Sequence, residues 1–119
     1  MEPRPVSLFD VVKRAVDIVD PDDEDAVVGE FERAFEDDDE PVAGLDVEER
    51  VADVLSQLDP AVNNGSLSMA GALTVYLSFR RDELHAHPEE LIRLAVRAEW
   101  DGEPPAPVTD WLDERNLAA

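Results

Sequence analysis

Apolar residues occupy nearly every angle of a helical wheel between residues 66 and 84. They are Leu67, Met69, Ala70, Ala72, Leu73, Val75, Tyr76, Leu77 and Phe79. A helix that is apolar all round must be covered on most sides. The run is also shorter than the ~20 mainly apolar residues that a bilayer span requires. We therefore predict a central buried helix over residues 66–84, covered by other helices of this chain or of a partner.

The first half of the chain shows apolar residues at helical spacing on one side only. Ser7 and Asp10 have the spacing of a capping box and predict the start of a first helix, which ends at Asp20. Asp20 followed by Pro21 predicts the cap and first position of a second helix. The acids at 22–25 then fall in its first turn, where the helix dipole favours them. Residues 1–6 contain two prolines and are expected to form an extended lead-in.

A third helix is predicted from Asp46 to about residue 58, where Asp59-Pro60 ends it. The turn residues at 63–65 then reverse the chain into the central helix, with Ser66 as its expected cap.

Pro88 places a fifth helix after the central one, and Asp101-Gly102 ends it. Residues 103–108 are rich in proline and predict an extended tether. A short last helix, with Thr109 as cap, is expected to dock weakly through Trp111, Leu112 and Leu117, with Trp100 as a contact. No alternating strand pattern appears anywhere in the chain. The predicted fold is a compact all-α bundle of five main helices and a short C-terminal helix, in one domain over 1–119.

Charge is the most unusual feature of the composition. The 119 residues include 30 Asp plus Glu and 10 Lys plus Arg, a net charge of -20, and 20 of the acids precede residue 65. This bias resembles that of cytosolic proteins from extreme halophiles, because molar salt shortens the Debye length to about 3 Å and screens crowded carboxylates. We expect diffuse cations at this surface. Duplex nucleic acid is not an expected partner, because its binding relies on basic contacts to phosphate.

Several classes of site are disfavoured by the sequence. The chain has no cysteine, which excludes disulfides and thiolate chemistry. Asp20, Asp22 and Glu24 resemble the opening of an EF-hand, but Asp25 and Phe31 stand where that loop needs glycine and glutamate. We expect no metal, no cofactor and no membrane association. The first residues show no signal-peptide pattern, so the expected location is the cytoplasm.

Basic and imidazole residues gather after the central helix. Six of the twelve in the chain are Arg80, Arg81, His85, His87, Arg93 and Arg97. In so acidic a protein this cluster is the candidate for holding an anion. The simpler interpretation is that Arg93 pairs with Glu89 or Glu90 and that the first arginines complement a helix C-terminus.

The spacing within this cluster resembles the arginine-then-histidine signature of the HEPN ribonucleases, small all-α domains that pair around an RNA-cleaving site. Four residues separate Arg80 from His85, and five separate Arg81 from His87. The resemblance implies that Arg81 stabilises a phosphate, that His87 or His85 transfers a proton, and that Asp82 orients the arginine. It covers these few positions only.

Two functional hypotheses follow. The first is a salt-adapted helical protein that acts without catalysis, by contact with a protein partner or by self-association, including as a homodimer. Its basis is a central helix with more apolar surface than five small helices easily cover. The second is an anion-binding or HEPN-like ribonuclease domain that uses Arg80, Arg81, His85 and His87.

Overall fold

The computed structural model describes residues 7–37, 46–61 and 63–117. These residues form six α-helices and one short 3₁₀ helix, with no strand among them. In chain order they are α1 (Leu8–Val19), α2 (Ala26–Ala34), α3 (Val47–Leu58), α4 (Gly65–Phe79), η1 (Arg81–Glu83), α5 (Pro88–Trp100) and α6 (Ala106–Glu114). The all-α fold class predicted from the sequence is confirmed. The predicted lead-in at 1–6 lies outside the described residues.

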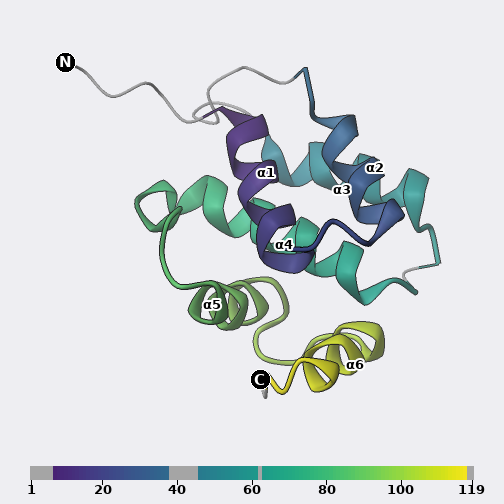
Figure 1. Ribbon diagram of the computed structural model, residues 1–119, viewed down its shortest axis with the longest axis vertical. Coiled ribbons are helices and arrows are strands. Elements are labelled where there is room, and N and C mark those ends of the chain that lie inside the picture. Colours follow the sequence, from purple (N-terminus) through teal and green to yellow (C-terminus); the bar gives the residue numbers. More distant parts are fainter. Residues whose placement is uncertain (1–6, 38–45, 62, 118–119) are drawn as a thin grey trace.

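Helix α4 runs through the middle of the molecule and contacts all five other α-helices (Figure 1). Its buried residues face every direction around its axis, from Leu67 and Met69 to Leu77 and Ser78. The central helix is therefore where the sequence predicted it, but both of its ends differ. The side chain of Asn64, rather than Ser66, caps it by accepting from the backbone N–H of Leu67 at 2.9 Å. It ends at Phe79, not at residue 84, and the chain turns into η1.

Helix α1 has the predicted capping box, in which the side chains of Ser7 and Asp10 each accept from the backbone N–H of the other. The predicted start of the second helix is wrong. Helix α2 begins at Ala26 behind the cap Asp25, and the acids at 22–24 precede it. The reason is that the Asp20 carboxylate accepts from the backbone N–H groups of Glu24 and Asp25, at 3.0 and 2.9 Å. Asp20 therefore organises a loop instead of capping a helix at Pro21.

Helices α3 and α5 match their predictions closely. Asp46 caps α3 by accepting from the backbone N–H of Glu49 at 3.2 Å. Pro88 occupies the first turn of α5, where its missing N–H costs nothing. Asp101 ends that helix in a left-handed conformation, with φ of 54°.

Helix α6 differs most from its prediction. It begins at Ala106 behind Pro105, so the extended tether covers only residues 103–105 and Thr109 lies inside the helix. It also docks firmly, because Val108, Trp111, Leu112 and Leu117 are all buried. Helix α6 lies against α4 on the side away from α2 and α3 (Figure 1).

Arg115 fastens the end of α6 to the rest of the bundle. Its guanidinium donates to the backbone carbonyl of Val19 at 2.6 Å and lies 4.4 Å from the centre of the Trp111 ring. The Cα radius of gyration is 13.4 Å, close to the ~13.5 Å of a compact chain of this length.

Candidate functional site

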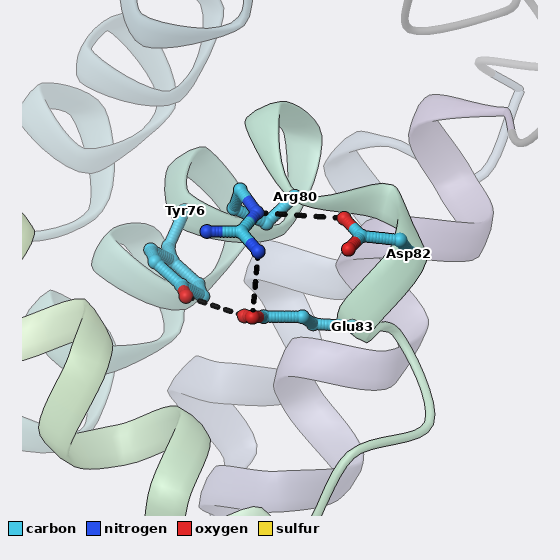
Figure 2. A network of polar contacts seen from close by, with 4 residues as sticks. All are labelled: Tyr76, Arg80, Asp82 and Glu83. Carbon is cyan, nitrogen blue, oxygen red and sulfur yellow. Dashed lines mark hydrogen bonds and ion pairs between the residues drawn. The ribbon is translucent and has the colours of Figure 1, made fainter.

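Arg80 ends α4 and directs its guanidinium onto the 3₁₀ helix that follows (Figure 2). Its Nη2 lies 2.9 Å from Oε1 of Glu83, and its Nε lies 3.4 Å from Oδ1 of Asp82. The hydrogen bond from Arg80 holds the pKa of the Asp82 carboxyl below its usual range. Asp82 thus pairs with Arg80, whereas the HEPN resemblance assigned it to Arg81. Because two carboxylates already offset the charge of Arg80, this arginine is a weaker candidate for binding an anion.

Glu83 also accepts a hydrogen bond from the hydroxyl of Tyr76, one turn back on α4 (Figure 2). Burial raises the pKa of Tyr76 to about 12, and the hydrogen bond and the charge of Glu83 add to the effect. Tyr76, Arg80, Asp82 and Glu83 therefore form one polar network that holds η1 against the end of α4. This network has a structural role: it stops α4 at Phe79.

The two histidines are held apart from this network. His87 caps α5, and its Nδ1 accepts from the backbone N–H of Glu89 at 3.3 Å. His85 is exposed beside α1. The turn that carries it is held by Arg14, whose Nε and Nη2 donate to the carbonyls of Leu84 and Ala86 at 2.9 and 3.1 Å. Sequence reasoning missed this role of Arg14.

Arg93 and Arg97 lie exposed on α5, one turn apart. Neither makes an ion pair within the described part of the chain, so the predicted pairing of Arg93 with Glu89 or Glu90 is wrong. The backbone of Arg81 belongs to η1, and its side chain lies outside what the structure describes. The six cluster residues are thus distributed over the end of α4, a turn, a helix cap and the face of α5.

An open groove is the better candidate site. Helices α3 and α5 both pack on α4 but hardly touch each other, and between them Val75 and Tyr76 of α4 are only partly buried while Phe79 is exposed. Two adjoining hollows of about 490 and about 300 Å³ lie there and share five lining residues. We call this the α3–α5 groove, and it is lined chiefly by Glu48, Val51, Leu55, Ser68, Ala72, Val75, Tyr76, Phe79, Ala98, Glu99 and Trp100.

The floor of the groove is apolar and the walls carry acids. Phe79 lies at one end of the floor and is 71% exposed, the one large apolar side chain so exposed among the described residues. Glu48 on α3 and Glu99 on α5 line both hollows. Desolvation raises the pKa of the Glu99 carboxyl, and the charge of Glu48 raises it further. The two carboxylates therefore repel each other electrostatically across the groove.

Gly71 shows that the small residues of α4 serve packing against α3. A Cβ at this position would lie 2.8 Å from Cδ1 of Leu55 and 3.2 Å from Cγ1 of Val51. Glycine at this position therefore lets α3 approach α4 closely. In the sequence, the groove was indicated only indirectly, by a central helix that is apolar all round and has more apolar surface than five small helices easily cover.

Comparisons with protein-family models, with curated proteins and with solved structures found no match to this chain. The chain's own geometry is therefore the basis for a function. No helix in the described segments has the length and apolarity needed to cross a bilayer. Nor do the described residues bring three His, Cys, Asp or Glu side chains together in a way that fits a metal ion.

Proposed function

We propose that this protein acts without catalysis, by contact with a protein partner or a second copy of itself, and that the α3–α5 groove is the contact surface. One observation carries the proposal: the C-terminal part of α4 leaves Val75 and Tyr76 only partly buried and Phe79 71% exposed in the hollow between α3 and α5. Water against such a surface is unfavourable at about 25 cal/mol per Å², so covering it favours association.

The groove also contains the residue types that dominate protein contacts. Trp100 lies on its α5 wall and Tyr76 on its floor, and Trp and Tyr are enriched among residues that contribute most to binding. Trp100 was expected to contact the last helix; it lies in the groove instead. The acidic composition fits a salt-rich cytoplasm, which remains part of the proposal.

The test uses two variants of the groove and one control. Ala98→Glu adds a third acid to the groove, and Phe79→Ser removes its exposed ring; both side chains are exposed, so the fold is expected to persist. Ala34→Glu makes the same change at an exposed position of α2 that does not line the groove. Association is measured in molar KCl, by light scattering of the pure protein and by capture from a lysate of the source cells.

The wild type and Ala34→Glu are expected to associate with themselves or with a partner. The two groove variants are expected to associate at least about tenfold more weakly, because Ala98→Glu would bury a charge and Phe79→Ser would lose a buried ring, each at a cost of more than about 1.4 kcal/mol. A strictly monomeric wild type that captures nothing would refute the proposal. So would groove variants that associate as well as the wild type.

The rival function, anion binding or RNA cleavage by the Arg/His cluster, has one observation in its favour. Arg93 and Arg97 point from α5 without a carboxylate partner in the part of the chain described. Against it stand the pairing of Arg80 and the use of His87 as a helix cap. Loss of phosphate or RNA binding in Arg93→Gln with Arg97→Gln would favour this rival, and His87→Ala would test its chemistry.

A further inference from the structure

Two carboxylates face the same stretch of the α3–α5 groove from opposite walls. Glu48 projects from the first turn of α3 and Glu99 from the last turn of α5, and both line the hollow above Ala72 and Val75. Like charges that face each other across a largely apolar floor are unfavourable. A cation placed between the two carboxylates would remove this cost.

The floor has the shape that receives a helix. Ser68, Ala72, Val75 and Phe79 follow one another at intervals of four, three and four residues along α4, so they form a single stripe on one face. This stripe is about 16 Å long at 1.5 Å per residue, which is about three turns of a second helix. Ala72 is already buried, so the parts of this stripe that an incoming helix can reach are Ser68, Val75 and Phe79. Helix-in-groove recognition uses such a stripe, flanked by the walls of two neighbouring helices.

We infer that the occupant of the groove is an amphipathic helix of a basic partner, with its apolar face on Val75 and Phe79 and a Lys or Arg side chain between Glu48 and Glu99. This rests on the proposed function, and it adds the chemistry of the partner. Arg80, at the far end of the groove, is already paired with Glu83 and leaves the acidic character of the walls intact.

A second copy of the chain fits the groove less well. A two-fold contact would place the same surface on both sides, so the acidic pairs of two grooves would meet. In dilute buffer the net charge of -20 opposes that approach at long range as well. A basic helix carries the opposite charge. Charge complementarity therefore selects a partner protein over self-association.

The test uses three synthetic helical peptides of about 18 residues. All carry leucine at positions i, i+4, i+7 and i+11, and they differ at one site beside this stripe, which is Lys, Gln or Glu. Binding to the full chain is measured by titration calorimetry in molar KCl. The Lys peptide is expected to bind up to about fivefold more tightly than the Gln peptide, because an exposed ion pair contributes at most about 1 kcal/mol in screened solution, and the Glu peptide is expected to bind most weakly.

Glu48→Gln with Glu99→Gln is expected to remove the preference for Lys. The matched control is Glu49→Gln with Glu90→Gln, which makes the same change of charge on the same two helices outside the groove and should retain the preference. Ala98→Glu reports separately on whether a peptide enters the groove at all.

Three outcomes would overturn the inference in different ways. If all three peptides bind alike and Ala98→Glu blocks them, the groove receives helices without regard to charge, and the proposed function stands. If no peptide binds and the wild type self-associates through the groove, the occupant is a second copy. If Ala98→Glu changes neither peptide binding nor association, the proposed function falls together with the inference.

Discussion

Glu83 shows how much of this structure depends on single polar contacts. Its carboxylate accepts from the hydroxyl of Tyr76 and from the guanidinium of Arg80, and both donors belong to the last turn of α4 or its cap (Figure 2). A hydrogen bond to a charged group contributes roughly 1.5 to 3 kcal/mol when it is sheltered, and less when it is exposed. Glu83 therefore ties the end of α4 to the 3₁₀ helix that follows it.

The titration of Tyr76 tests this network directly, because the chain has one tyrosine. Burial and Glu83 raise its pKa to about 12 in the folded protein, against about 10 in an unfolded chain. The folded state therefore holds the proton more tightly. The stability that the contact provides is complete below about pH 10 and is lost as the pH rises through about 12.

The expected observation is a phenolate transition in the near-ultraviolet absorbance at a pH close to 12. In Glu83→Gln the midpoint should move toward 10, since the carboxylate no longer opposes a negative phenolate. Circular dichroism on the same samples shows whether the helices persist. A folded wild type that titrates near 10, or a midpoint that Glu83→Gln leaves unchanged, would contradict the network.

At the scale of whole elements, α6 depends on a close approach to the start of α4. A Cβ on Gly65 would lie 2.1 Å from the carbonyl oxygen of Pro107 and 3.0 Å from Cβ of Trp111. The obstacle is backbone, which cannot rotate away as a side chain does. Glycine at 65 is therefore required by the packing of α6, although the sequence suggested only a turn there.

Gly65→Ala should destabilise the protein by about 2 kcal/mol or more, because overpacking forces the two backbones apart. Gly29→Ala is the control: a Cβ there meets nothing within 4 Å, and alanine in a helix is expected to add about 0.5 to 1 kcal/mol of stability. Both values are measured by urea unfolding in molar KCl. Equal stability of the two variants would show that α6 does not dock on Gly65.

At the scale of the whole molecule, we expect charge to set the conditions under which this core is stable. Thirty acids face ten bases on a chain of 119 residues, and acids such as Asp22, Asp23 and Glu24 are exposed. Their mutual repulsion is felt over a Debye length of about 30 Å in dilute buffer and about 3 Å in molar salt. The folded state brings these charges together, so dilute buffer penalises it more than the unfolded chain.

The melting temperature is therefore expected to rise steadily as KCl increases from millimolar to molar concentrations. Replacing Asp22, Asp23 and Glu24 with Asn, Asn and Gln removes three negative charges from exposed positions whose side chains make no hydrogen bond or ion pair within the described residues. This variant should melt at a higher temperature in dilute buffer and depend less on salt. A wild-type melting temperature that is flat or falls with KCl would contradict the electrostatic account.

Local chemistry explains which parts of the fold were predictable. The capping box at Ser7, the cap at Asp46 and Pro88 at the start of α5 each act within a few residues, so the sequence alone located these helix starts. The predicted start of the second helix was wrong, because the same local sequence is compatible with two structures. Asp20-Pro21 is compatible with a helix cap or a loop, and the hydrogen bonds from Glu24 and Asp25 select the loop.

The candidate site was less predictable than the fold. Grouping by sequence distance joined Arg80, His87 and Arg97, but the chain turns twice between them and separates their side chains. The groove depends on Glu48 and Glu99, which are 51 positions apart in the sequence and face each other only after folding. No local rule connects such a pair.

The sequence by itself determined the all-α class and the central place of the helix predicted over residues 66–84, because periodicity and caps act locally. Only the tertiary structure decided that α6 docks firmly and that Phe79 at the end of α4 stays exposed. Both results depend on which surfaces remain after the helices have packed. That is a property of distances between residues far apart in the chain, and a linear pattern does not contain those distances.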